Sequence, residues 1–159
     1  MQTQQAVIEW LHAVCELGHK FDFATIDQYG LLIGRSPKNE FALEDTFADP
    51  FFEEVERLVD QILGEWRTLK GGTSGFFHRV LGYACDPAPS GLRYFFTGAA
   101  WCPVCGSRAK DYDAYSPPRT ELLDIPLVTH REWNNLTPQE KRSKIVQALR
   151  ETGCLPEGV

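Results

Sequence analysis

Apolar residues recur at helical spacing near the start of the chain. Over residues 3–18 the apolar side chains stand three and four positions apart: Val7, Trp10, Leu11, Val14 and Leu17. Gly18 follows the last of them, as glycine often does where a helix ends. We therefore expect a helix over residues 3–18. His12 and Cys15 lie just off its apolar stripe, and we expect them to be surface or packing residues and not ligands.

Two further helices are predicted by their start signals. Asp49-Pro50 supplies an N-cap side chain followed by proline at the first helical position, and apolar residues then recur as far as Leu69, before Gly71-Gly72. Thr137-Pro138-Gln139-Glu140 matches a capping box, in which the first and last side chains each bond the other's backbone N–H. This second signal predicts a helix that ends at Gly153.

Four stretches are predicted as strands. Residues 29–35 form a short apolar run between turn residues, and residues 121–129 place Leu123, Ile125 and Leu127 on one face. Residues 76–85 and 92–100 flank the turn-forming segment 86–91, which predicts a β-hairpin. The element order predicts an α+β fold: a small antiparallel sheet, made of the hairpin and one or two further strands, with three packed helices. The length of 159 residues fits a single domain, residues 1–159.

Composition narrows the class of protein. Hydrophobic residues at 43% and charged residues at 24% are ordinary values for a folded domain. No apolar run reaches the ~18–20 residues of a membrane span, and no signal peptide opens the chain. Five cysteines are an odd number, which argues against a disulfide framework and favours reduced thiols. These features predict a cytoplasmic protein with no membrane partner.

The net charge of −6 is concentrated in one segment. Between residues 40 and 65, nine acidic residues accompany one basic residue, Arg57. A field of this sign repels phosphate backbones and attracts basic proteins, so nucleic acid is a poor partner. The segment is either a solvated face that keeps the protein in solution or a docking surface for a cationic protein. The docking interpretation uses six acidic residues: Glu44, Asp45, Asp49, Glu53, Glu56 and Asp60.

Cys102 and Cys105 have a spacing that implies specific chemistry. The segment Trp101-Cys102-Pro103-Val104-Cys105-Gly106 resembles the metal-binding knuckle of rubredoxins and zinc ribbons, Cys-Pro-x-Cys-Gly, and this resemblance is local. It implies one half of a tetrahedral zinc site, because such sites take two ligands from a tight knuckle and two from elsewhere. The chain has no second Cys-x-x-Cys to supply the other half.

The remaining ligands can be ranked from the predicted hairpin. In its register His78 lies opposite Ala99, close to Cys102, whereas Cys85 lies at the turn, roughly 30 Å away at ~3.3 Å per residue. His130, at the end of the last predicted strand, can also reach the pair if that strand pairs alongside the hairpin. We therefore expect His130 and His78 to complete the zinc site ahead of Cys85, with Cys154, an acidic side chain or water as further options.

Two other interpretations of the cysteine pair remain open. The thiols can sit in a turn without a metal, or they can form a redox dithiol similar to that of thioredoxin, in which a tryptophan precedes the first cysteine. Thioredoxins place their pair at the start of a helix, whose dipole lowers the pKa of the first thiol. The residues after Gly106 are a poor helix start, which weakens the redox interpretation.

Other catalytic motifs are absent from the sequence. There is no Gly-x-Ser-x-Gly elbow, no His-Glu-x-x-His helix and no dinucleotide-binding glycine pattern. We therefore interpret the chain as a small acidic, non-enzymatic protein that binds a basic protein partner and carries a structural zinc knuckle. Small bacterial immunity proteins, which neutralise toxins, have a similar size and charge. The alternative is a thiol-disulfide oxidoreductase that uses Cys102 and Cys105, and a nucleic-acid-binding zinc ribbon comes third.

Overall fold

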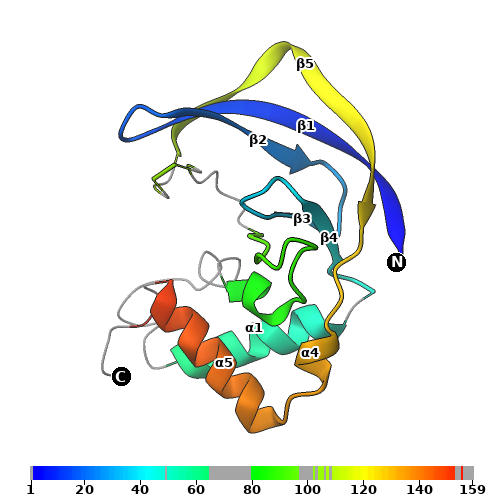
Figure 1. Ribbon diagram of the computed structural model, residues 1–159, viewed down its shortest axis with the longest axis vertical. Helices are drawn as coiled ribbons and strands as arrows, with labels where there is room; N and C mark the ends of the chain where they lie inside the picture. The colour runs from blue at the N-terminus through cyan, green and yellow to red at the C-terminus, as the bar shows by residue number, and fades with distance from the viewer. Residues whose placement is uncertain are drawn as a thin grey trace.

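Two antiparallel β-sheets and a group of helices make up the fold (Figure 1). The computed structural model describes residues 2–48, 50–64, 80–96, 102, 104, 105, 107, 109–152 and 155. A three-stranded sheet has the order β2-β1-β5, from Lys20–Ile26, Thr3–Cys15 and Ala109–Pro126. A two-stranded sheet pairs β3, Leu31–Arg35, with β4, Phe41–Asp45. The helical elements are α1, Pro50–Leu63, the 3-10 turn η1, Leu81–Ala84, the short α4, Arg131–Asn134, and α5, Pro138–Glu151.

The three-stranded sheet arches over one end of the molecule, and the helices lie at the other end (Figure 1). The β3–β4 hairpin lies between them, and an isolated parallel bridge joins Leu43 to Leu127, directly after β5. The apolar core is divided in the same way. One buried cluster, centred on Ile8, Leu43 and Ile125, joins the two sheets, and a second packs α1, η1 and α5 around Trp133.

The predicted fold of a small sheet packed with three helices is wrong, because most of the first twenty-six residues form strands. Residues 3–15 are the central strand of the larger sheet and not a helix. Ala6 and Ile8 are buried while Val7 between them is 55% exposed, which is the alternation of a strand. The β-branched and aromatic residues of this stretch favour strands, and their spacing also fits a helical stripe.

The predicted hairpin over 76–85 and 92–100 is wrong where the structure describes it. Leu81–Ala84 forms η1 in place of a strand. Gly82 allows this turn to pack closely against the backbone of Tyr94. A Cβ at Gly82 would lie 1.9 Å from the backbone oxygen of Tyr94, so only glycine fits this approach. Residues 76–79 and 97–100 of the predicted hairpin lie outside the described residues.

Four predicted elements are confirmed at least in part. The strand predicted over 29–35 is β3, and the helix predicted after Asp49 is α1, whose expected continuation beyond residue 64 lies outside the described residues. The capping box of α5 is present: the Thr137 hydroxyl accepts from the Glu140 N–H at 3.2 Å, and the Glu140 carboxylate accepts from the Thr137 N–H at 2.9 Å. The strand predicted over 121–129 is the end of the much longer β5.

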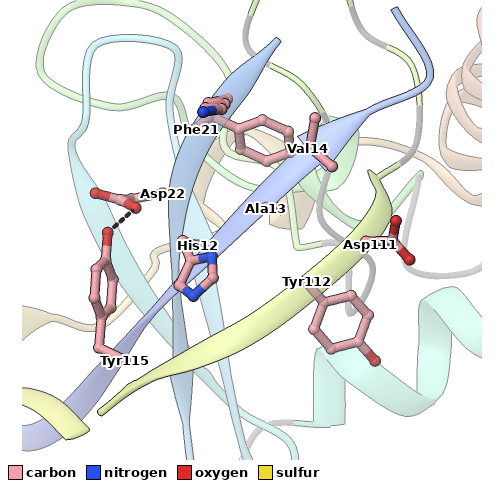
Figure 2. A pocket seen from close by; sticks show the side chains of 9 residues that line it. His12, Ala13, Val14, Phe21, Asp22, Asp111, Tyr112 and Tyr115 are labelled. Atoms are coloured by element: carbon pink, nitrogen blue, oxygen red, sulfur yellow. Dashed lines mark hydrogen bonds between the residues drawn. The ribbon is translucent and has the colours of Figure 1, made fainter. Parts of the chain in front are cut away.

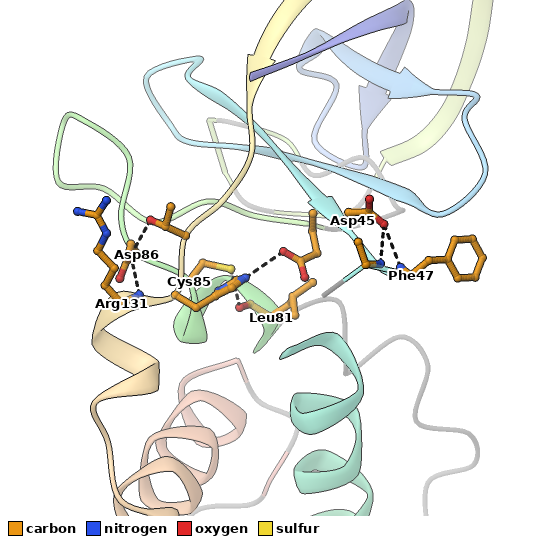
Figure 3. Close-up of polar contacts among 10 residues, drawn as sticks. Asp45, Phe47, Leu81, Cys85, Asp86 and Arg131 are labelled. Atoms are coloured by element: carbon orange, nitrogen blue, oxygen red, sulfur yellow. Dashed lines mark hydrogen bonds and ion pairs between the residues drawn. The ribbon is translucent and has the colours of Figure 1, made fainter. Parts of the chain in front are cut away.

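A set of polar contacts joins the sheets to the helices (Figure 3). The carboxylate of Asp86 accepts hydrogen bonds from the backbone N–H groups of Arg131 and Glu132 at 2.9 and 3.1 Å, and from the Thr129 hydroxyl at 2.6 Å. The first two N–H groups open α4, so Asp86 caps this short helix from a distant part of the chain. Nearby, His130 Nε2 lies 3.2 Å from Glu44 Oε2, and both side chains are buried.

Candidate metal centre

Three cysteines and one histidine gather at the end of the three-stranded sheet. They are Cys15, His19, Cys102 and Cys105, and one ligand atom from each lies within 4.8 Å of the others. Thiolate sulfur and imidazole nitrogen are metal-binding donors, so this group could hold a metal ion. We call these four residues the thiol–imidazole cluster.

The turn between β1 and β2 supplies two members of the cluster. Cys15 ends β1 and His19 immediately precedes β2. The Cys15 N–H donates to the His19 carbonyl and the Gly18 N–H donates to the Cys15 carbonyl, both at 3.0 Å. Gly18 has φ of +88°, a conformation that suits glycine and closes the turn tightly. The turn therefore brings His19 Nδ1 to 3.3 Å from Cys15 Sγ.

The segment that leads into β5 supplies the other two members. The Cys102 N–H donates to the Ser107 carbonyl at 2.8 Å, which closes a loop around Cys105. The Val104 N–H points to Cys102 Sγ at 3.4 Å. Cys15 pairs with Ala109 in the β1–β5 register, only two residues after Ser107. The pairing of β1 with β5 therefore places the Cys102–Cys105 loop beside the β1–β2 turn.

Contacts between the two segments close the cluster. Cys105 Sγ lies 3.7 Å from Cys15 Sγ, and Cys102 Sγ lies 3.7 Å from His19 Nδ1. Each segment therefore contributes two donors, and each donor pair contacts the other pair. Cys15 and Cys102 are buried, whereas Cys105 is exposed.

The pKa values of the cluster residues are shifted in different directions by their surroundings. Hydrogen bonds from the hydroxyl and the N–H of Ser107 lower the pKa of Cys105 to about 6. Contacts with the Cys105 and Cys15 thiols raise the pKa of His19 above its ordinary value. Burial raises the pKa of Cys15, but the N–H groups of His19 and Leu17 more than offset this and leave it lowered. Burial raises the pKa of Cys102.

Among the described residues, the structure brings together Cys102 and Cys105 of the expected metal ligands. Cys102 and Cys105 lie in the cluster, but His130 is a buried neighbour of Glu44 and its ring stacks on Phe51 with centroids 3.5 Å apart. His78 lies outside the described residues, as does Cys154. Cys85 is buried elsewhere, with its Sγ 3.4 Å from the Leu81 carbonyl.

Sequence reasoning missed Cys15 and His19. We expected Cys15 to pack on a helix, and the strand places it instead beside the Cys102–Cys105 loop. The spacing Cys15-x-x-x-His19 with glycine just before the histidine was the available signal, because a short turn between two donors is typical of zinc half-sites. The cysteine pair is also followed by strand β5 from Ala109 and not by a helix, unlike the thioredoxin arrangement.

A pocket of about 570 Å³ lies on the three-stranded sheet (Figure 2). It is lined by residues of β1, β2 and β5, among them His12, Asp22 and Tyr115. Figure 2 shows the Tyr115 hydroxyl directed at Asp22, to which it donates at 2.5 Å, and this contact raises the pKa of Tyr115. His12 packs against the Tyr115 ring with centroids 5.0 Å apart, so it is a pocket residue and not a member of the cluster.

The acidic residues expected at a docking surface do not share one environment. Glu44 is 1% exposed and its carboxylate contacts the His130 ring, so it is not available to a partner. Asp45 accepts from the N–H groups of Phe47 and Ala48, both at 3.0 Å (Figure 3). On α1, Glu53 and Glu56 are exposed and Asp60 is half-buried. Asp49 lies outside the described residues.

Comparison with known proteins gives no family for this chain. No helix among the described residues is long and apolar enough to cross a membrane. No protein-family model matches the sequence, and neither a curated protein nor a solved structure matches it. The candidate centre therefore stands on its donor atoms and their geometry, and these identify a thiol–imidazole cluster suited to a metal ion.

Proposed function

We propose that the chain binds one zinc ion through Cys15, His19, Cys102 and Cys105. The spacing of the donors supports this. With Zn–S bonds of about 2.3 Å and a Zn–N bond of about 2.0–2.1 Å, a tetrahedral site has S···S edges of about 3.8 Å and S···N edges of about 3.6 Å. The S···S contact of 3.7 Å and the S···N contacts of 3.3 and 3.7 Å are close to these edges.

The donor types also favour zinc over the common hard cations. Calcium and magnesium take oxygen ligands, whereas three sulfurs and one imidazole nitrogen suit zinc. Two N–H groups point at the sulfurs, from His19 to Cys15 at 3.3 Å and from Val104 to Cys102 at 3.4 Å. Such contacts orient thiolate ligands and spread their negative charge, as hydrogen bonds around metal ligands generally do.

The proposed role of the ion is structural. Four protein donors fill a tetrahedral zinc, whereas catalytic zinc keeps one position open for water or substrate. The ion would join the β1–β2 turn to the segment entering β5, two parts of the chain far apart in sequence. A closed site of this kind supports a non-enzymatic zinc protein over a thiol-disulfide oxidoreductase, whose two thiols must be free to react.

Metal analysis of the purified protein tests this proposal. We expect one zinc per chain in the wild type and a loss of most of it in Cys102→Ser and His19→Ala. His12→Ala and Cys85→Ser are matched controls, because both residues lie outside the cluster, and both should retain one zinc. Wild-type protein prepared with added zinc that retains none after gel filtration would overturn the proposal, as would an equal loss in the controls.

A second proposal concerns a protein partner, and an exposed aromatic pair favours it. We propose that a basic protein, such as a toxin neutralised by this chain, docks beside the start of α1. Tyr29 is 93% exposed and Phe47 is 69% exposed, and their ring centroids are 5.1 Å apart. Aromatic side chains are enriched at protein interfaces, and the exposed Glu53 and Glu56 on the following helix would attract a basic surface.

Charge reversal tests the docking proposal. A basic protein captured by the wild type should bind at least tenfold more weakly to Glu53→Lys/Glu56→Lys and to Tyr29→Ser, and its affinity should fall with added salt. Glu121→Lys, at an exposed acid on β5, is the control and should bind normally. Equal binding by the wild type and the three variants would show that Glu53, Glu56 and Tyr29 take no part in docking.

A further inference from the structure

One of the three thiols of the cluster is open to reagents in solution. Cys105 is exposed, whereas Cys15 and Cys102 are 2% and 3% exposed. A small oxidant such as hydrogen peroxide can therefore reach the sulfur of Cys105 ahead of the other two. Thiolates held by zinc keep enough nucleophilic character to react with such oxidants, because the reactive form of cysteine is the thiolate.

The sulfur that lies against Cys105 Sγ is that of Cys15, at 3.7 Å. A disulfide requires about 2.05 Å, a shift that small rotations of the two side chains can supply. Cys102 Sγ contacts the Val104 N–H at 3.4 Å and His19 Nδ1 at 3.7 Å, and it lies within 4.8 Å of the other donor atoms of the cluster. The direct contact between the Cys105 and Cys15 sulfurs therefore favours Cys15 as the partner of an oxidised Cys105.

We propose that Cys105 is an oxidation site, at which hydrogen peroxide converts the zinc centre into a Cys15–Cys105 disulfide and releases the ion. This inference rests on the proposed zinc site. The Cys105 thiolate attacks one peroxide oxygen and the O–O bond breaks, which gives a sulfenic acid and hydroxide. The Cys15 thiolate then attacks the Cys105 sulfur, the S–S bond forms and a second hydroxide leaves. Two electrons pass from the two sulfurs to one peroxide, and His19 and Cys102 alone no longer hold zinc.

The disulfide would link the same two segments that the ion links. Cys15 belongs to the β1–β2 turn and Cys105 to the loop before β5, so the covalent bond replaces the metal as the connection between them. A Cys102–Cys105 disulfide would instead lie within one segment and leave the two parts unconnected. Oxidation at Cys105 therefore exchanges one link for another, and a dithiol reductant would restore the thiolates and the zinc site.

Peroxide titration of the zinc-loaded protein tests the proposal. We expect one zinc released per chain for each equivalent of peroxide consumed, as measured with a chromogenic chelator, together with a Cys15–Cys105 disulfide mapped by mass spectrometry. Dithiothreitol and added zinc should reverse both changes. A Cys102–Cys105 disulfide, or a sulfinic acid at Cys105 without a disulfide, would overturn the proposal.

A ligand exchange and a control outside the cluster test the role of Cys105. Cys105→His leaves two cysteines and two histidines, a donor set that still suits zinc, and it should retain its zinc at least tenfold longer in peroxide than the wild type. Cys85→Ser, at a buried cysteine outside the cluster, should release its zinc at close to the wild-type rate. Equal rates in both variants would contradict the proposal. A wild type that binds no zinc would instead refute the zinc site itself, and the disulfide mapping still decides the pairing.

Discussion

Glu44 and His130 form a buried contact at the junction of the sheets with the helices. Glu44 lies on β4, and His130 immediately precedes α4, with its ring stacked on Phe51 of α1. The two side chains are 1% and 7% exposed, and their Oε2 and Nε2 atoms are 3.2 Å apart. A buried charged group depends on its partner, because water cannot replace the lost interaction. This contact therefore ties three elements to one another at the level of single side chains.

Glu44→Ala should lower the free energy of unfolding by about 3–5 kcal/mol, since it leaves His130 buried without this carboxylate. Glu53→Ala is the matched control: it removes an exposed glutamate and should change stability by less than about 0.5 kcal/mol. Urea denaturation followed by circular dichroism measures both values. Similar losses in the two variants would mean that the buried contact contributes no more than a surface charge.

Zinc affinity should fall as the pH is lowered, because zinc and protons compete for the same atoms. In the metal-free protein the pKa of His19 is raised by the nearby thiols and that of Cys102 is raised by burial, so both hold protons at higher pH than usual. The pKa of Cys105 is lowered to about 6 by its hydrogen bonds with Ser107. We expect roughly a tenfold loss of affinity per pH unit for each proton bound. A chelator competition between pH 8 and pH 5 measures this slope, and a flat profile would contradict it.

Asp86 is the clearest case in which one residue decides whether an element forms. Its carboxylate accepts from two N–H groups at the start of α4, a helix of only 4 residues. Burial raises the pKa of Asp86, but the Thr129 hydroxyl and the N–H groups of Arg131 and Glu132 more than offset this and leave it lowered. Such a short helix has little stability of its own, so its geometry depends on this distant cap.

Asp86→Ala should cost about 1–2 kcal/mol of stability, the usual value of a lost helix cap. Because the folded-state pKa of Asp86 is below its ordinary value, the carboxylate stabilises the fold above that ordinary value and the contribution disappears as the pH falls through the folded-state pKa. The wild type should therefore lose more stability than Asp86→Ala on acidification below pH ~4. Chemical denaturation at several pH values compares the two. Parallel pH profiles would exclude this role for Asp86.

Elements with local signals were predictable, and elements that depend on distant partners were not. The α5 capping box and the Asp49-Pro50 start of α1 are fixed by residues a few positions apart. The spacing of Val7, Trp10 and Val14 is that of a helical stripe, and the pairing of β1 with strands on both sides overrides it. In the same way, the spacing of Cys102 and Cys105 predicted half of a metal site. The spacing of Cys15 and His19 was also readable from the sequence, but their position beside Cys102 and Cys105 depends on the pairing of β1 with β5.

At the scale of the whole molecule, the thiol–imidazole cluster lies at the opposite end from the helical core. The β1–β2 turn and the segment before β5 meet at the far end of the arch, whereas α1 and α5 pack around Trp133. A metal at the cluster would therefore link the β1–β2 turn to the segment before β5 and, among the described residues, would take no ligand from a helix. Loss of the metal should first destabilise the region where the β1–β2 turn meets the segment before β5.

Removal of zinc should lower the melting temperature by roughly 8–16 °C, the shift expected when ligand present at about 1,000 times its Kd is withdrawn from a chain of this size. Hydrogen exchange should increase in the β1–β2 turn and at the start of β5 while α5 stays protected. Calorimetry and mass spectrometry before and after treatment with a chelator measure both effects. Uniform loss of protection, α5 included, would contradict a local role for the ion.

The pairing of β1 with β5 sets the order in which the chain can fold during its synthesis. Cys15 pairs with Ala109, so more than ninety residues must be translated before the partner of β1 exists. At about 5–20 residues per second this takes roughly 5–20 s. The β1–β2 hairpin can form at once, but the second edge of β1 stays open throughout that interval and can pair with another nascent chain. We therefore expect this open edge of β1 to be the part of the nascent chain that is most exposed to pairing with another chain.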